Sequence, residues 1–259
     1  MWTRQLLKEN GKIAFKRNYW TCVAVSAIVM LLGGGGIVGG NDYEFNVQTE
    51  QQQFKGDLLT AIPSYFLYAL GAATLMAVAV AICVNILLSN VVAIGCNRYF
   101  LENREHKTDV GQIFYGFKEG RYGTNVWIMF LRQLYIFGWS LLFVIPGIVK
   151  SYSYMMVPYI LAENDDLDKD RVFEMSRDMM YGHKMEAFVL ELSFLGWTLL
   201  GALTAGVLNI VYANPYIHAT MAEFYSALKE EAIRSGKVMP SELPGVSPVF
   251  QDNMNFNNF

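Results

Sequence analysis

Three aspartates that alternate along the chain are the first residues whose types could bind a metal ion. Asp166, Asp168 and Asp170 have the spacing of a calcium-binding loop, in which alternate carboxylates ligate the ion. That loop also needs a glycine and a glutamate farther on, and Arg171 and Arg177 stand at those positions. We therefore interpret the aspartates as helix-capping and solvated residues and expect no metal site.

The histidines and cysteines carry no catalytic pattern either. No HExxH, CxxC or nucleophile-elbow motif occurs, and the cysteines fall in or beside apolar blocks without paired spacing. These six residues are His106, His183, His218, Cys22, Cys83 and Cys96. We expect neither a cofactor nor an enzyme.

Two charges inside apolar sequence, Arg132 and Glu191, have the sharpest expected role. Arg132 lies six residues before one copy of a Gly-Trp pair, and Glu191 lies five before the other copy. Because an ion inside a membrane costs several kcal/mol unless it is paired, the sequence predicts an intramembrane ion pair between them. The alternative is that both side chains extend to the cytoplasmic headgroups. Glu163 and Glu223, which each follow a Pro-Tyr helix, lie nearer the cytoplasmic end.

The two Gly-Trp pairs belong to a longer repeat. Residues 138–160 read GWSLLFVIPGIVKSYSYMMVPYI, and residues 196–217 read GWTLLGALTAGVLNIVYANPYI. Gly147 aligns with Gly206, and the Pro-Tyr-Ile ends align when a one-residue adjustment is allowed on each side of that glycine. Trp and Pro-Tyr rarely match by chance, so we interpret the repeat as an internal duplication.

The apolar blocks are too long to be single helices. The chain is 53% hydrophobic and 17% charged, with the apolar residues concentrated in blocks, which indicates a membrane protein. Residues 126–162 would make a helix of about 55 Å and residues 187–228 one of about 63 Å, against a hydrocarbon core of about 30 Å. Each block must break, and we predict the breaks at Pro146-Gly147 and at Gly206.

The predicted fold is therefore all-α, a polytopic membrane bundle of six transmembrane helices in three hairpins. The spans are expected at about 20–40, 64–95, 125–146, 147–163, 187–205 and 206–228. They form one domain over residues 1–236, and the tail at 237–259 lacks periodicity and is expected to be disordered. Of 20 Lys and Arg, seventeen then fall on one side, which places both termini in the cytoplasm.

Two amphipathic helices are expected outside the spans. Residues 3–18 should form an interfacial helix whose lysines meet anionic headgroups, the alternative being a solvated leader. The segment 168–185 has apolar residues at helical spacing and should lie on the membrane face or cap the bundle. The apolar and basic residues of the first helix are Leu6, Leu7, Ile13, Ala14, Phe15, Lys8, Lys12, Lys16 and Arg17.

The glycine-rich run LLGGGGIVGG ends the first predicted span. It lacks the Gly-Lys-Ser/Thr ending of a phosphate-binding loop. Its small-xxx-small faces instead favour close packing of another helix. The close-packing glycines are Gly35, Gly36, Gly39 and Gly40.

Three runs carry a family resemblance: IPGIVKSYSYMMVPYILAEN, SRDMMYGHKMEAFVLELSFLGWTLL and PYIHATMAEFYSAL. They resemble an uncharacterised bacterial membrane-protein family known as domain of unknown function 975. The chain is more distantly similar to the membrane domains of glycerophosphodiester phosphodiesterases, whose catalytic domain this sequence does not contain. The resemblance implies a multi-pass protein of the bacterial plasma membrane and supplies no catalytic residues.

The expected function is that of a non-enzymatic accessory or envelope-maintenance component. Its expected partners are the lipid bilayer and other membrane proteins or a second copy of the chain, with no nucleic acid. The alternative is a small-solute transporter or channel, which broken helices near glycine and proline would fit. A membrane-embedded enzyme is the least favoured class, because no nucleophile, metal or acid–base constellation occurs.

Overall fold

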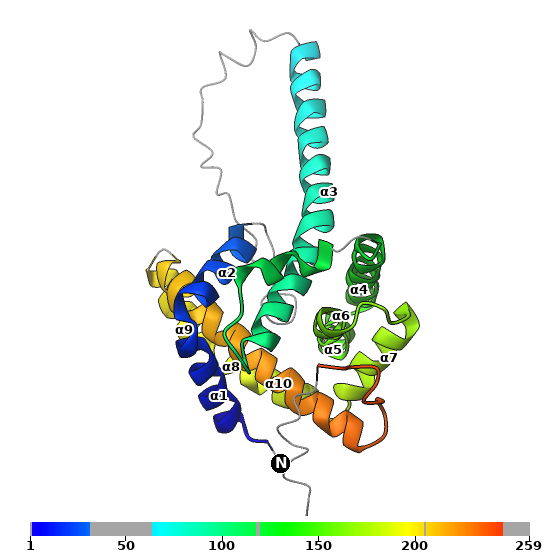
Figure 1. Cartoon of the computed structure of the whole chain (residues 1–259). Coiled ribbons are helices and arrows are strands. Elements are labelled where there is room, and N and C mark those ends of the chain that lie inside the picture. The colour runs from blue at the N-terminus through cyan, green and yellow to red at the C-terminus, as the bar shows by residue number, and fades with distance from the viewer. Residues whose placement is uncertain (1, 32–63, 118–119, 205, 246–259) are drawn as a thin grey trace, which may run out of the picture.

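The computed structural model describes residues 2–31, 64–117, 120–204 and 206–245, and all regular structure within these ranges is helical (Figure 1). The all-α prediction is thus confirmed. The elements are α1 (Arg4–Arg17), α2 (Tyr19–Leu31), α3 (Ser64–Glu102), η1 (Val110–Phe117), α4 (Tyr122–Leu142), α5 (Val144–Ser153), α6 (Val157–Glu163), α7 (Lys169–Met179), α8 (Lys184–Leu192), α9 (Leu195–Leu203), η2 (Asn209–Ala213) and α10 (Asn214–Arg234). The glycines at 35, 36, 39 and 40 lie outside the described residues.

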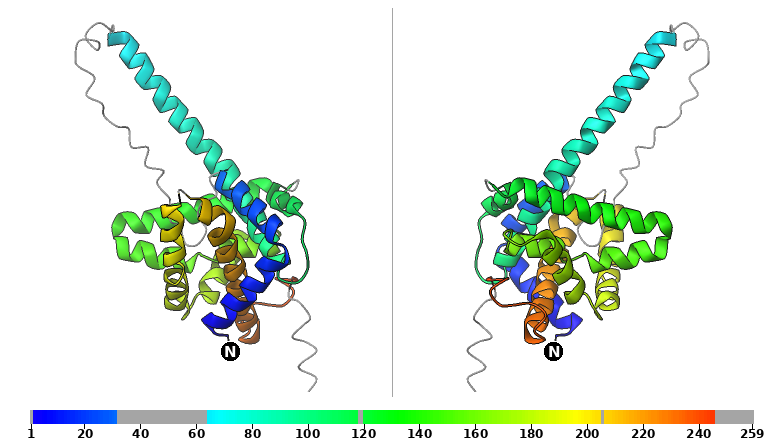
Figure 2. Two further views of the ribbon diagram at one scale, coloured as in Figure 1. Left: turned by 90° about the vertical axis from the view of Figure 1, so that its left-hand side faces the viewer. Right: turned by 90° about the vertical axis from the view of Figure 1, so that its right-hand side faces the viewer.

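The C-terminal half of α3 is the centre of the packed core. It contacts η1, α6 and α10, while α1 lies along α10. Gly95 of α3 permits the approach of η1, because a Cβ at this position would lie 1.8 Å from the carbonyl oxygen of Ile113. Tyr159 of α6 stacks on Tyr225 of α10 with ring centroids 5.3 Å apart. The N-terminal half of α3 projects beyond the other helices (Figures 1 and 2).

Large apolar side chains are exposed where the helical hairpins turn. At the turn from α4 to α5, Leu141 is 77% exposed and Ile145 is 75% exposed, and Leu203 at the end of α9 is 83% exposed. Contiguous exposed apolar surface of this kind marks contact with lipid or with another protein. Among the described residues, one stretch, Lys184–Leu203, is long and apolar enough to cross a membrane, with a mean hydropathy of 1.4. This single stretch leaves the six predicted spans unconfirmed.

The break predicted at Pro146-Gly147 lies elsewhere. The chain turns at Phe143, which is extended with φ −157° and ψ 141°, and Pro146 falls in the first turn of α5. Proline is tolerated there because the first N–H groups of a helix have no intrahelical acceptor. Gly147 instead serves close packing, since a Cβ would lie 2.8 Å from Cα of Ser140. Gly206, with φ +84°, does lie in the turn between α9 and η2.

Both copies of the repeat change helix geometry just before their Pro-Tyr pair. In the first copy the helix is interrupted after Ser153 and resumes as α6, with Pro158 in its first turn. In the second copy the π-helix η2 precedes α10, with Pro215 in its first turn. The common cause is the missing N–H of proline, which cannot continue the regular α-helical pattern. The duplication therefore extends from sequence to backbone irregularity.

The segment 237–245, which we call the strap, departs from the expectation of a disordered tail. Within the strap, the side chains of Val238 and Leu243 are almost completely buried, with 1% and 0% of their surface exposed. The backbone N–H of Gly245 donates to Glu163. These anchors fix a segment that has no helical period, so periodicity alone could not reveal its order.

Candidate functional site

The candidate site is a polar cavity of about 320 Å³ at the C-terminal ends of α3 and α6. The middle of α10 forms another wall, and Gly245 of the strap closes part of the rim. The charged and hydroxyl-bearing residues that line it include Arg98, Glu102, Arg104, Glu163, Tyr225 and Lys229. Helix ends thus bring together charges that are far apart in the sequence.

A buried ion pair between Glu163 and Lys229 forms the wall of this cavity, and only 5% of each side chain is exposed. Glu163 Oε2 accepts from the Tyr225 hydroxyl at 2.8 Å, and Oε1 accepts from Gly245 N–H at 2.8 Å and from the Lys229 ammonium. Tyr225 and Lys229 are four residues apart on α10, so one helix face presents both donors. Burial lowers the pKa of Lys229, while the Glu163 carboxylate opposes that shift.

Two arginines tie α3 and its following loop to the other walls. Arg98 Nε donates to Glu102 at 2.6 Å, and its Nη1 donates to the carbonyl of Ala162 at 3.1 Å. This places a cation at the C-terminal end of α6, where free carbonyls and the helix dipole favour positive charge. Arg104 forms an ion pair with Glu223 at 3.0 Å. Each cation is therefore balanced by a nearby carboxylate.

The chemistry available here is polar binding. A molecule in the cavity could accept from Lys229, whose three-donor ammonium is bonded to the single acceptor Glu163, and could donate to the carboxylates. Within the described ranges, no three His, Cys, Asp or Glu side chains are placed to hold a metal ion. Asp168 is the N-cap of α7 and accepts from Asp170 N–H at 3.1 Å, which confirms its interpretation as a capping residue.

The structure does not bring Arg132 and Glu191 together. Arg132, 8% exposed on α4, donates through Nε to the carbonyl of Tyr154 at 2.9 Å. Glu191 on α8 accepts from the hydroxyl of Tyr152 at 2.5 Å. The two partners lie in and just beyond the last turn of α5, so each charge receives one hydrogen bond there, while Glu191 Oε1 is buried without a partner among the described residues. The predicted ion pair is replaced by two hydrogen bonds that sequence spacing could not show.

We therefore expect Arg132→Leu and Glu191→Leu to act independently on stability. Their double mutant should be additive within about 0.5 kcal/mol, as for residues without a shared contact. Tyr152→Phe and Glu191→Leu should instead couple by more than about 0.5 kcal/mol, because they remove the two ends of one hydrogen bond. Unfolding of the purified protein in mild detergent measures both cycles. Strong coupling in the first cycle, with none in the second, would restore the ion pair.

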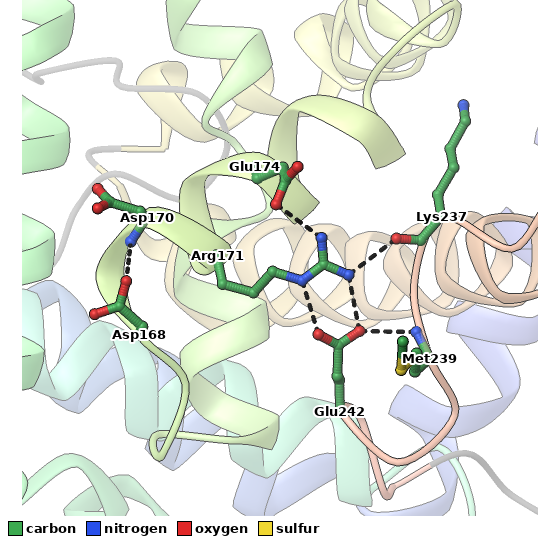
Figure 3. Close-up of polar contacts among 7 residues, drawn as sticks. All are labelled: Asp168, Asp170, Arg171, Glu174, Lys237, Met239 and Glu242. Atoms are coloured by element: carbon green, nitrogen blue, oxygen red, sulfur yellow. Dashed lines mark hydrogen bonds and ion pairs between the residues drawn. The ribbon is translucent and has the colours of Figure 1, made fainter.

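The strap is fastened by a fork between Arg171 of α7 and Glu242 (Figure 3). Nε and Nη2 of Arg171 donate to the two carboxylate oxygens of Glu242 at 2.7 and 2.9 Å. The Met239 N–H also donates to Glu242, at 2.8 Å, and Arg171 Nη1 donates to Glu174 at 2.8 Å. The hydrogen bonds from Arg171 hold the pKa of Glu242 below its ordinary value of 4.5.

Breaking this fork should loosen the strap. Glu242→Gln replaces a bidentate charged acceptor, so amide exchange of the strap should accelerate by about tenfold or more, from the 1.5–3 kcal/mol typical of charged hydrogen bonds. Because the folded-state pKa of Glu242 is lowered, the stabilisation is present above pH 4.5 and is lost as pH falls through the folded-state pKa. Hydrogen exchange with mass spectrometry measures both effects.

Glu174→Gln is the matched control, since Glu174 is a single, half-exposed acceptor of the same guanidinium. It should leave exchange in the strap nearly unchanged. Equal acceleration by both substitutions would show that the fork does not hold the strap.

Most of the cavity was not foreseen from the sequence. Glu163 and Glu223 attracted attention as acids after the two Pro-Tyr helices, and both take part in ion pairs beside the cavity. Arg98, Tyr225 and Lys229 did not. The four-residue spacing of Tyr225 and Lys229 was the available sequence signal, because it places both side chains on one face of a helix.

The family comparison covers about a third of the chain, within its second half. Residues 141–232 match the family described as "Protein of unknown function (DUF975)". The matched region includes Glu163, Tyr225 and Lys229, and it supports an uncharacterised domain family here. The chain has no significant match among curated proteins or among solved structures.

Proposed function

We propose that the protein is a polytopic protein of the bacterial plasma membrane with six spans and both termini in the cytoplasm. We further propose that it acts without catalysis, as an accessory component of a membrane complex or of envelope maintenance. The observation that carries this proposal is the contrast between the exposed apolar hairpin turns and the polar cavity, with its buried ion pair, at the C-terminal ends of α3 and α6.

The lengths of the helices support the proposed spans. The helix α4 has 21 residues, and α8 and α9 together cover Lys184–Leu203. At 1.5 Å per residue, each is about 30 Å long, which matches the hydrocarbon core. The exposed stretch from 133 to 149, between Arg132 and Lys150, contains no charged residue. An exposed surface without charge is suited to contact with lipid, because the lipid-facing side of a transmembrane helix is apolar.

The polar cavity supports a binding role over catalysis. Its ion pairs are mutually balanced, and the Glu163 carboxylate already accepts three hydrogen bonds. A carboxylate with three hydrogen bonds is a weakened general base, because most of its acceptor positions are engaged. The charges therefore serve best to fix the helix ends and to present a polar surface to a partner.

Purification of the native complex in mild detergent tests the accessory role. The tagged protein should resist alkaline extraction from membranes and should retain a membrane protein in fixed stoichiometry, identified by mass spectrometry. The retained protein should be lost when an exposed turn is changed, as in Leu203→Lys, but kept with Lys169→Glu on the exposed side of α7. The proposal would be overturned if alkaline treatment extracted the protein from membranes and the purified protein carried no other protein.

A second candidate, a small-solute transporter or channel, is favoured by the interrupted helices before both Pro-Tyr pairs. Transporters place such discontinuities beside their substrate sites. The protein reconstituted alone should then collapse an imposed proton or potassium gradient faster than empty vesicles do. Glu163→Gln should remove that flux if the cavity lies on the pathway, whereas an accessory protein should leave the gradient intact.

A further inference from the structure

The structure divides the apolar residues of α1 between two faces. Leu7, Gly11, Ala14 and Phe15 are buried. This face packs on α10, where a Cβ on Gly11 would lie 2.8 Å from Cα of Thr220. The sequence pattern alone suggested one apolar surface, but the protein itself covers this part of it.

The second face remains uncovered. Leu6 and Ile13 are 45% and 65% exposed, and they are seven residues apart, which places them on the same side of α1 two turns apart. Trp20, just beyond the junction with α2, is 77% exposed. Tryptophan at this kind of junction is typical of the membrane–water interface, where its ring is apolar and its N–H can meet water.

The basic residues of α1 also divide into two sets. Lys8 lies over the ring of Phe194 at 4.5 Å, and Arg17 donates to the carbonyl of Glu105 at 3.1 Å. Lys12 and Lys16 are exposed and have no hydrogen bond or ion pair with the described residues. Lys16 lies one turn beyond Ile13 on the uncovered face, and Lys12 lies beside it at the edge of that face. The one acid on this face is Glu9, which accepts from Gln5 at 3.1 Å. Two lysines against one glutamate leave this face with a net positive charge.

The orientation of α1 fits a helix that lies on a membrane. In both views of Figure 2, α1 runs across the direction of α3. If α3 spans the bilayer, a transverse helix near the end of its apolar stretch lies along the membrane surface. In this orientation the exposed apolar side chains can contact acyl chains, while the exposed basic side chains contact headgroup phosphates.

We propose that the outer face of α1 docks on an anionic lipid surface. Leu6, Ile13 and Trp20 enter the interface, and Lys12 and Lys16 contact lipid phosphates. This proposal rests on the proposed membrane function and adds the lipid class and the docking residues. Because each lysine near an anionic surface contributes about 1 kcal/mol, losing both should lower the docked-to-undocked ratio by about thirtyfold.

Fluorescence from a probe at position 13 tests the docking. The full chain, with its native cysteines replaced and Ile13→Cys labelled with an environment-sensitive dye, is placed in nanodiscs of phosphatidylcholine with or without phosphatidylglycerol. We expect emission to shift to shorter wavelength, and quenching by lipid-attached quenchers to increase, when the anionic lipid is present. Added salt should reduce both effects, because it screens the lysines.

Charge variants complete the test. Lys12→Glu with Lys16→Glu should abolish the difference between the two lipids, whereas Lys169→Glu with Lys237→Glu, the same charge change elsewhere, should preserve it. The docking would be overturned if the dye at position 13 showed a water-exposed emission in both kinds of nanodisc. It would also be overturned if Lys12→Glu with Lys16→Glu left the difference between the two lipids unchanged. Alkaline extraction of the protein is measured in parallel. Extraction would contradict the membrane proposal itself, while an integral protein with a water-exposed probe would contradict the docking alone.

Discussion

Lys229→Met is expected to destabilise the folded protein by about 3–5 kcal/mol, since it leaves a buried carboxylate without its cation. Both members of the Glu163–Lys229 pair are 5% exposed, so solvent compensates only a small part of the lost ammonium. Thermal or denaturant unfolding in mild detergent measures the loss. Lys169→Met is the control, because Lys169 is exposed and should change stability by no more than about 0.5 kcal/mol.

The double variant Glu163→Gln with Lys229→Met distinguishes pairing from packing. Removing both charges should recover much of the stability, because the new amide oxygen at position 163 can still accept from the Gly245 N–H and the new NH2 group can donate to the Tyr225 hydroxyl oxygen. A double variant as unstable as the sum of the single variants would show that the charges are not energetically coupled. A Lys229→Met variant as stable as the control would show that the pair contributes little.

Gly95→Ala should be the most damaging single-methyl change in α3. The new Cβ would meet three backbone atoms of Ile113 at 1.8, 2.4 and 2.8 Å, and backbone cannot move aside as a flexible side chain can. Overpacking of this kind costs about 3 kcal/mol or more, at the upper end of its usual range. The expected result is a lowered unfolding temperature and faster amide exchange in η1.

Gly71→Ala provides a matched control in the same helix. A Cβ on Gly71 meets nothing within 4 Å, so alanine should leave stability unchanged or raise it by up to about 1 kcal/mol through helix propensity. If both substitutions had the same effect, the close approach of α3 and η1 would not be a determinant of stability.

Local periodicity and length predicted the helices well, because those signals arise within each segment. The helical hairpins followed from block length, and the turn at Gly206 from a residue that tolerates positive φ. The first turn was misplaced because Pro146 marks a helix start as readily as a helix end. The sequence alone does not show whether a given proline starts a helix or ends one.

Long-range pairings were beyond prediction. The expected partners Arg132 and Glu191 each have a hydrogen-bond partner on or next to α5 instead, because backbone carbonyls and tyrosine hydroxyls can also bond a charged side chain. The strap was missed for a related reason, because its order comes from Arg171 and from burial of Leu243 rather than from a local pattern. Such contacts depend on how helix ends meet in space.

Cysteine labelling in intact cells tests the membrane account most directly. Four variants are made in a cysteine-free background, each with one cysteine. Two replace Phe143 or Leu203 at the exposed turns, and two replace Lys169 or Lys237 on the side that is expected to face the cytoplasm. The account predicts that an impermeant thiol reagent reaches positions 143 and 203 from outside, and positions 169 and 237 only after permeabilisation. Labelling of positions 169 or 237 before permeabilisation, or of positions 143 and 203 only afterwards, would contradict it.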